Sequence, residues 1–267
     1  MKNFEGLLLV TDLDGTLLRH DKSISKENLE AIEYFKANGG KFTFITGRLP
    51  VGSKRIYNMV RPNAPIGCIN GGGIFDWEKE QMLWHMALCD EALFLAEYVD
   101  KNMPTMGIEL NAFDKIYFCK KNRAVEQHRK NENFEDIICH YTEVDEPVSK
   151  ILFADESEEI DKLVELLAKY AESEMYDFIR SDPKYYEVLP KGSSKGNLVA
   201  KIAQMVDIDI KNTIAVGDND NDVSMLKIAG RGYAVSNASD NAKAAADFIT
   251  VSNEEHAIAK VIEECLA

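Results

Sequence analysis

The chain has 267 residues, 45% of them hydrophobic, so it can bury a full core and is long enough for two compact units. Its formal net charge of −14 argues against nucleic acids and acidic membrane surfaces as partners, because binding to polyanions requires concentrated Lys and Arg. Small molecules are therefore the favoured ligands.

Predicted strands and helices alternate at both ends of the chain. From the N-terminus we expect a strand at 7–10, a helix capped by Ser25 and ended by Gly39 and Gly40, a strand at 41–46, a helix at 53–60 and a strand at 65–69. From about residue 186 we expect helices at 194–205, 222–229, 242–246 and 254–266, and strands at 213–216, 233–235 and 248–251. Such repeated units predict an α/β fold with a doubly wound parallel sheet and right-handed crossovers.

The middle of the chain has a different pattern, in which strand-like runs follow one another directly. These runs are expected at 105–110 and 115–119 and again at 175–179 and 185–189, with helices at 91–101 and 158–171. Neighbouring strands of this kind predict an antiparallel sheet with helices on one face. We therefore expect a core domain formed by residues 1–82 and 186–267, and an inserted α+β domain formed by residues 83–185.

Two acidic residues, Asp12 and Asp14, directly follow the first predicted strand. Alternation along an extended chain points both side chains the same way, so two like charges would face each other. A divalent cation between them is the economical explanation, and an oxygen-only site near phosphate suggests Mg²⁺. The alternative is a solvated acidic turn, in which Asp-Gly is common.

Further polar side chains occur where other strands of the core should end. Thr46 and Gly47 follow the strand at 41–46, Lys195 opens a helix, and an acidic loop, 217–222, follows the strand at 213–216. The carboxyl ends of parallel strands gather at one edge of the sheet, where ligands bind, so we expect these groups to converge. Singly, each has a plainer explanation as a turn residue, a solvated lysine or a helix cap.

The converging groups suit phosphoryl transfer. A carboxylate that approaches a dianionic phosphate ester is repelled unless a metal ion and an ammonium neutralise the phosphate oxygens, and Mg²⁺ and Lys195 would do so. Thr46 and backbone amides beyond Asp12 can hold the remaining oxygens. Asp12 could then attack phosphorus, while Asp14 protonates the leaving alcohol and later deprotonates water. That double role requires a pKa for Asp14 above that of a metal-bound carboxylate.

The motifs together resemble a known family. In order they are DLDGT at 12–16, Thr46 in ITGR, Lys195 in KGSSKG and GDNDND at 217–222. Their types, order and spacing resemble the four motifs of the haloacid dehalogenase-like (HAD) hydrolase superfamily. The long insert between the second and third motifs and the NGG at 70–72 resemble the Cof-type subgroup with a large α/β cap, subclass IIB. Many such proteins have Asn-Gly-Ala where this chain has NGG.

The resemblance implies roles for the acidic residues and their neighbour. Asp12 matches the nucleophile and a metal ligand, and Asp14 matches the general acid and base, with its backbone carbonyl on Mg²⁺. Asp218 matches the acidic metal ligand. Arg48 either faces the substrate or pairs with a carboxylate, and the sequence leaves both possibilities open.

The resemblance also implies a phosphate-binding set. Thr46 and Lys195 match phosphate-binding positions, and Gly47 would allow a close backbone approach. Asn221 and Asp222 match positions that support the metal or the phosphate.

The leading hypothesis is a Mg²⁺-dependent phosphatase of small phosphorylated metabolites, with sugar phosphates as the first guess and the cap setting specificity. A phosphotransferase or phosphomutase would share this chemistry. A phospho-aspartate signalling receiver also combines an acidic pair, Thr and Lys on a doubly wound sheet, but the large insert and Asp14 argue against it. A catalytically inactive binding protein is the remaining alternative.

The sequence also indicates a cytoplasmic setting. No apolar stretch approaches the roughly 20 residues of a membrane-spanning helix, and the N-terminus has no secretory signal pattern. The five cysteines are scattered without a CxxC pair, and the five histidines show no HxH or HExxH pattern. These patterns argue against a disulfide framework and against a zinc or iron site. Oligomeric state is not readable from the sequence.

Overall fold

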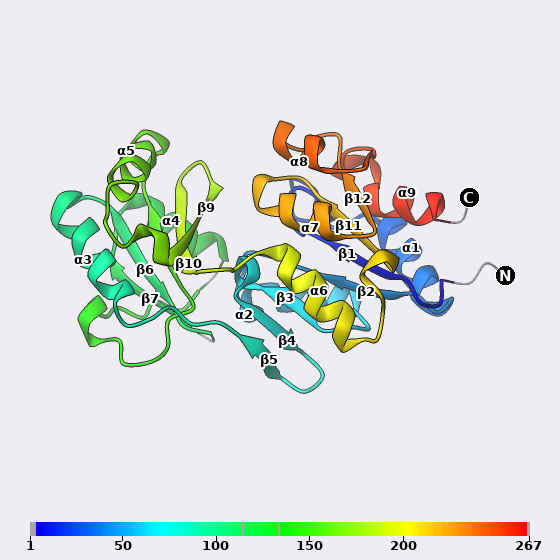
Figure 1. Cartoon of the computed structure of the whole chain (residues 1–267), viewed down its shortest axis with the longest axis horizontal. Helices are drawn as coiled ribbons and strands as arrows, with labels where there is room; N and C mark the ends of the chain where they lie inside the picture. Colours follow the sequence, from blue (N-terminus) through cyan, green and yellow to red (C-terminus); the bar gives the residue numbers. More distant parts are fainter. Residues whose placement is uncertain (1–3, 114, 133, 266–267) are drawn as a thin grey trace. The chain divides into compact units, whose positions relative to one another are not determined.

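The computed structural model describes residues 4–113, 115–132 and 134–265. The chain divides into two compact units, each with its own hydrophobic core (Figure 1). The first unit contains Met1–Arg48, Ser53–Trp84 and Ser194–Ala267, and the second contains Leu49–Gly52 and His85–Ser193.

A parallel sheet forms the centre of the first unit, in the order β13-β12-β11-β1-β2. Its strands are β1 (Leu8–Thr11), β2 (Lys41–Phe44), β11 (Thr213–Gly217), β12 (Arg231–Ala234) and β13 (Phe248–Ile249). The helices of this part are α1 (Lys26–Ala37), α2 (Pro50–Val60), α6 (Lys195–Met205), α7 (Val223–Ile228), α8 (Asp240–Ala245) and α9 (Ala257–Glu264). The predicted α/β fold with a parallel sheet is confirmed.

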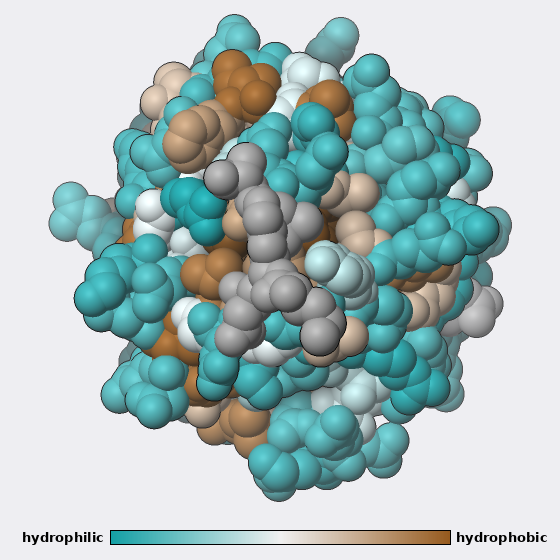
Figure 2. All heavy atoms as spheres, turned by 90° about the vertical axis from the view of Figure 1, so that its right-hand side faces the viewer, coloured by the Kyte–Doolittle hydropathy of each residue, from teal (hydrophilic) through white to brown (hydrophobic). Residues whose placement is uncertain are grey.

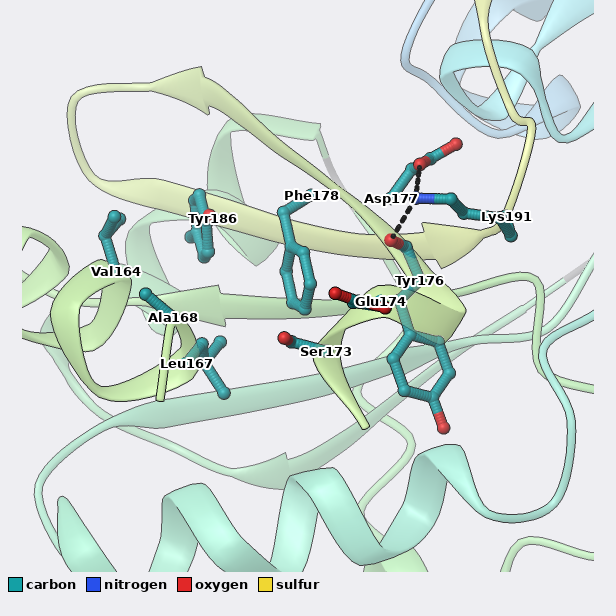
Figure 3. A pocket seen from close by; sticks show the side chains of 10 residues that line it. All are labelled: Val164, Leu167, Ala168, Ser173, Glu174, Tyr176, Asp177, Phe178, Tyr186 and Lys191. Carbon is teal, nitrogen blue, oxygen red and sulfur yellow. Dashed lines mark hydrogen bonds and ion pairs between the residues drawn. The ribbon is translucent and has the colours of Figure 1, made fainter. Parts of the chain in front are cut away.

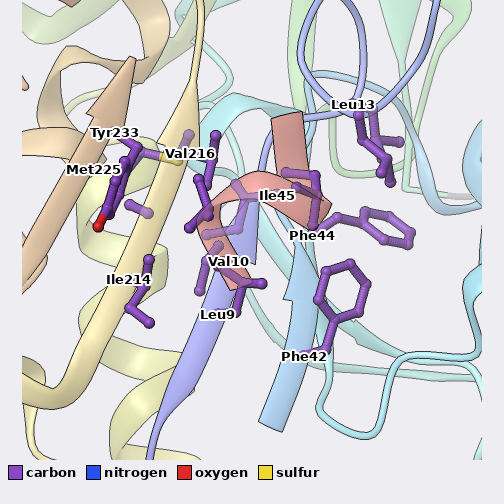
Figure 4. Close-up of a cluster of buried hydrophobic side chains, with 14 of the residues drawn as sticks. Leu9, Val10, Leu13, Phe42, Phe44, Ile45, Ile214, Val216, Met225 and Tyr233 are labelled. Atoms are coloured by element: carbon purple, nitrogen blue, oxygen red, sulfur yellow. The ribbon is translucent and has the colours of Figure 1, made fainter. Parts of the chain in front are cut away.

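Three adjacent strands of this sheet, β11, β1 and β2, are almost completely buried. Every residue of β1 is buried, as expected for a parallel strand, and its neighbours β2 and β11 are almost as apolar. Their side chains pack into one cluster, whose labelled members on the three strands are Leu9, Val10, Phe42, Phe44, Ile214 and Val216 (Figure 4). This packing fixes the strand ends that carry the polar motifs.

A second, antiparallel sheet belongs to the other unit and has the order β7-β6-β8-β10-β9. Its strands are β6 (Gly107–Asn111), β7 (Ile116–Lys120), β8 (Lys150–Ala154), β9 (Tyr176–Asp182) and β10 (Tyr185–Pro190), and its helices are α3 (Ala92–Asn102), α4 (Arg123–Glu132) and α5 (Ser157–Leu167). An antiparallel sheet with helices was expected here. The sequence did not predict β8 or α4, although β8 lies in the middle of the sheet.

The return to the first unit comes later than the expected residue 186. Residues 185–190 form β10, which pairs with both β8 and β9, so this stretch stays with the second unit until Ser193. The sequence carries no linker at this point, only Pro190 and Gly192, which explains why the boundary was placed too early.

A small antiparallel sheet, β3-β4-β5, extends the first unit. It consists of β3 (Ile66–Cys68), β4 (Gly73–Asp76) and β5 (Gln81–His85), and only β3 was predicted. The remaining elements are short 3₁₀ turns: η1 (Ile69–Gly71), η2 (Tyr141–Glu143), η3 (Ser173–Met175), η4 (Ile210–Asn212), η5 (Asp220–Asp222) and η6 (Asn253–Glu255). Turn η1 joins β3 to β4.

The surface is mainly hydrophilic where Figure 2 shows it, with apolar side chains in small separate groups. Among the described residues, no helix combines the length and the apolar character needed to cross a membrane.

One buried asparagine links α1, near the start of the chain, to α9, near its end. The Asn28 side chain is fully buried in α1, and its Oδ1 accepts a hydrogen bond from the backbone N–H of Ala259 in α9 at 2.9 Å. The replacement Asn28→Ala would leave this N–H, in the first turn of α9, without its acceptor. We expect the free energy of unfolding to fall by about 1–3 kcal/mol. Urea denaturation monitored by circular dichroism measures the change, and an unaltered midpoint would contradict it.

Candidate active site

Two neighbouring parallel strands bring Asp12 and Asp218 to the same edge of the sheet. Strand β1 pairs with β11 so that Thr11 lies opposite Val216, and each acidic residue follows directly after its strand. The backbone N–H of Asp12 donates to the carbonyl of Val216 at 2.9 Å, which holds the two strand ends together. Convergence at the carboxyl edge is the behaviour that the topology predicts.

A buried lysine bridges two of the acidic side chains. Lys195 is 1% exposed and is the first residue of α6, which Ser194 caps by accepting from the N–H of Asn197. Its Nζ lies 2.6 Å from Asp12 Oδ1 and 2.6 Å from Asp222 Oδ1. Burial alone would lower the pKa of Lys195, but the two carboxylates outweigh it and raise the pKa, so the side chain remains an ammonium.

Three carboxylates form an acidic cluster around this ammonium. One oxygen each from Asp12, Asp218 and Asp222 can be chosen so that all lie within 4.8 Å of one another. Burial and the neighbouring carboxylates raise the pKa of Asp12 well above its usual range, although Lys195 opposes the shift. Burial and Asp222 raise the pKa of Asp218 to about 6. One ammonium does not offset three carboxylates, so the cluster favours a further cation.

The donor set of the cluster fits Mg²⁺, which prefers oxygen ligands. Both carboxylate oxygens of Asp222 already accept hydrogen bonds. Its Oδ1 accepts from Lys195, and its Oδ2 accepts from the backbone N–H groups of Asp218 and Asn219. Asp12 and Asp218 are therefore the side chains that would hold the ion. The Thr16 hydroxyl donates to Asp218 Oδ1 at 2.7 Å and orients that carboxylate.

The glycine of the first motif is required by close packing against Asp218. Gly15 has φ +86°, and a Cβ atom placed on it would lie 2.5 Å from Asp218 Oδ2. Any other residue would push the carboxylate out of the cluster or strain the turn.

The second acidic residue of the pair, Asp14, is not part of this cluster. Its carboxylate accepts from Arg48 Nε at 2.9 Å and Nη2 at 3.0 Å, and from Lys22 Nζ at 2.8 Å. Burial would raise the pKa of Asp14, but Arg48 and Lys22 outweigh it and lower the pKa to about 2. The expectation of a raised pKa is therefore wrong for this arrangement. The sequence left open whether Arg48 faces the substrate or pairs with a carboxylate, and in the structure it pairs with the Asp14 carboxylate.

Apart from Lys195, the predicted phosphate-binding residues lie in two loops that meet at Asn70. Thr46 is buried, and its Oγ1 accepts from the N–H of Arg48 at 3.2 Å, which is a turn contact. A Cβ placed on Gly47 would lie 2.8 Å from the Asn70 side-chain amide, and Asn221 Nδ2 donates to Asn70 Oδ1 at 3.0 Å.

Sequence reasoning missed three residues of this region: Thr16, Lys22 and Asn70. Thr16 ends the DLDGT motif and Asn70 begins NGG, so both stood in recognised patterns without an assigned contact. Lys22 gave no signal, because only the folded turn brings it to Asp14.

A hollow of about 430 Å³ lies in the second unit. It is lined by α5, η3 and β9, and its rim lysine, Lys191, is already paired with Asp177 at 3.1 Å and with the carbonyl of Tyr176 (Figure 3). None of the predicted site residues lines it.

A family model for haloacid dehalogenase-like hydrolases matches residues 9–262. The chain belongs to this family. The recognition made from the sequence motifs is thereby confirmed, and the protein is an enzyme of the hydrolase class.

Three known proteins match this HAD hydrolase along nearly their whole length. The putative phosphatase YxeH of Bacillus subtilis is 29% identical, over 96% of this chain and 97% of the relative. The 5-amino-6-(5-phospho-D-ribitylamino)uracil phosphatase YitU of the same organism is 27% identical, over 96% of each. The crystal structure of a haloacid dehalogenase-like hydrolase from Bacteroides thetaiotaomicron superposes with a TM-score of 0.84 at 28% identity, covering 97% of this chain and 99% of that one.

Removal of one charge from the acidic cluster should stabilise the metal-depleted HAD hydrolase. The folded-state pKa of Asp218 is about 6, above the ordinary 3.8, so the folded protein binds this proton more tightly than the unfolded chain does. The charged carboxylate thus lowers stability above that pKa, and the penalty disappears as pH falls toward 3.8. In EDTA at neutral pH we expect Asp218→Asn to raise the free energy of unfolding by about 1–2 kcal/mol, allowing for partial screening.

The same comparison in acid is the control. Parent and variant should show nearly equal urea midpoints once Asp218 is protonated in both states. A variant that is less stable than the parent at neutral pH in EDTA would contradict the repulsion inferred for the cluster.

Proposed function

We propose that this HAD hydrolase is a Mg²⁺-dependent phosphatase of small phosphorylated metabolites, sugar phosphates first among them. The observation that carries the proposal is the buried Lys195 ammonium, 2.6 Å from Asp12 and from Asp222, beside the Asp218 carboxylate. A site with this charge pattern suits a substrate that is itself a dianion and that arrives with a divalent cation.

Each group has a role in the proposed reaction. Asp12 attacks phosphorus and the phosphorus–oxygen bond to the leaving alcohol breaks, which gives an aspartyl-phosphate. Lys195 neutralises phosphate oxygens and holds the Asp12 carboxylate in place. Bound Mg²⁺, held by Asp12 and Asp218, would supply further charge neutralisation. The Thr46 hydroxyl and the backbone at Gly47 hold the remaining phosphate oxygens.

Asp14 completes the cycle as the proton carrier. For the first step Asp14 must first take up a proton, because Arg48 and Lys22 lower its pKa to about 2; it then protonates the leaving alcohol, and afterwards it removes a proton from the water that attacks the aspartyl-phosphate. Arg48 and Lys22 hold it as a carboxylate, which is the form needed for the second step.

The relatives support this substrate class. YitU is named for a phosphorylated ribityl compound, in which the phosphate sits on a polyhydroxylated chain. The net charge of −14 favours such small ligands over polyanionic partners. A cytoplasmic setting agrees with the five cysteines, which are all free thiols in the structure.

Asp12→Asn is the decisive substitution for the nucleophile. It keeps the shape of the side chain and removes the charge that attacks phosphorus, so we expect kcat to fall by about three orders of magnitude or more. Release of inorganic phosphate from 4-nitrophenyl phosphate and from hexose phosphates measures the loss. Retained turnover in a folded variant would refute the assignment.

Product analysis separates hydrolysis from transfer. With Mg²⁺ present, we expect stoichiometric free phosphate from sugar phosphates and none after addition of EDTA. Isomerised sugar phosphate without free phosphate would instead identify a phosphomutase. An aspartyl-phosphate that survives for hours would identify a signalling receiver, which the family match already disfavours.

A further inference from the structure

One short segment contacts both of the loops that carry Asp12 and Asp218. It comprises residues 236–239, lies between β12 and α8, and belongs to the first unit. The N–H of Ser239 donates to the carbonyl of Asp218 at 2.8 Å. The Asn237 Nδ2 donates to the carbonyl of Gly15, the residue after Asp14, at 2.9 Å. The segment is therefore placed to set how these two loops lie against each other.

The separation of the two loops leaves little tolerance at Gly15. A Cβ placed there would lie 2.5 Å from Asp218 Oδ2, and the Thr16 hydroxyl donates to Asp218 Oδ1 at 2.7 Å. Glycine is conformationally permissive, so the direction of the Gly15–Thr16 peptide depends on its hydrogen bonds. The N–H of this peptide makes a long bond of 3.4 Å to the carbonyl of Leu13, whereas its carbonyl accepts from Asn237 at 2.9 Å. Asn237 thus provides the shorter of these two contacts.

The Asn237 carboxamide is itself oriented at both ends. Its Oδ1 accepts from the backbone N–H of Asn253 at 3.0 Å, while its Nδ2 donates to Gly15. An N–H can only donate and a carbonyl can only accept, so these partners fix which end is nitrogen. The Asn253 side chain is buried, and its Nδ2 donates to the carbonyl of Leu18 at 2.9 Å. Two linked asparagines therefore hold the turn of residues 13–18 at Gly15 and at Leu18.

Exposure distinguishes the contribution of Asn237 from ordinary structural support. Asn237 is exposed and Gly15 is partly exposed, so water can replace the lost donor when the side chain is removed. The stability cost of that exchange is small. A water molecule does not fix the direction of the peptide, however, and the turn carries Asp14. The contact is therefore better suited to positioning than to stability.

We propose that Asn237 is a positioning residue that fixes the turn of residues 13–18 against Asp218 and so places Asp14 for proton transfer to the leaving alcohol. The role of Asp14 in this inference rests on the proposed function. The placement of the turn by Asn237 does not, because it follows from the contacts of Gly15, Asn253 and Asp218.

Two substitutions separate the two ends of the carboxamide. Asn237→Ala removes both, whereas Asn237→Asp keeps the shape and the acceptor for Asn253 but cannot donate to the Gly15 carbonyl. We expect kcat/KM for a hexose phosphate, at saturating Mg²⁺, to fall by about 3- to 10-fold in Asn237→Ala and at least as far in Asn237→Asp. Urea midpoints should stay at the parent value.

A second substrate tests whether Asn237 acts through Asp14. The 4-nitrophenolate ion leaves without being protonated, whereas a sugar hydroxyl needs the acid. For 4-nitrophenyl phosphate we therefore expect kcat/KM to change by less than about twofold in both variants. An equal loss on both substrates would overturn the proposed placement of Asp14, and so would an Asn237→Asp variant as active as the parent.

Hydrogen–deuterium exchange of the chain in EDTA gives a measurement that does not depend on turnover. Amides of residues 13–18 should exchange faster in both variants than in the parent, while those of α1 should not change. Asn38→Ala is the matched control, because it removes a surface carboxamide that donates to the carbonyl of Tyr34 at 2.8 Å, and it should alter neither exchange in the turn nor kcat/KM.

The inference and the proposed function can fail separately. Unchanged exchange at residues 13–18 in both variants would overturn the inference even in an active phosphatase. Faster exchange in both variants of a chain that hydrolyses no phosphate ester would refute the proposed function and support the placement of the turn by Asn237.

Discussion

The balance of charge around Lys195 is the constraint on which the rest of the site depends. A buried ammonium 2.6 Å from Asp12 and from Asp222 is stable because carboxylates accompany it, and removal of both partners would leave an uncompensated buried charge. With Asp218 added, three ionised carboxylates face one ammonium, so two negative charges are not offset within the cluster. This residual charge makes the site receptive to a cation, and the cation in turn makes it receptive to a phosphate dianion.

This arrangement could be predicted in outline because it follows from topology. Parallel strands place their carboxyl ends at one edge, so Asp12 after β1 and Asp218 after β11 had to be neighbours once the two strands paired. The helix-capping serine before Lys195 made the start of α6 readable as well. The structure places these residues together, while their catalytic roles stay predictions.

Other features depend on tertiary contacts that carry no local signal. Strand β8 is a short buried run that begins with Lys150, and only its pairing with β6 and β10 makes it a central strand. Residues 186–193 read as part of the core because strand propensity does not reveal which sheet a strand joins. Asn70 was noted as the first residue of the NGG motif, but its contact with Asn221 could not be predicted, because 151 residues of sequence separate the two.

Asp14 shows most clearly how the environment of a residue decides its chemistry. The sequence argument required a carboxyl that holds a proton, whereas Arg48 and Lys22 lower its pKa to about 2 and keep it charged. A protonated Asp14 and a charged Asp14 are compatible at different steps if a second anion competes with Asp14 for Arg48 and Lys22. A phosphate ester offers more negative charge than one carboxylate, so it would compete with Asp14 for Arg48 and Lys22, and the partly buried carboxyl, without these cations, would hold a proton more readily. On this argument, the two cations would couple protonation of the acid to arrival of the substrate.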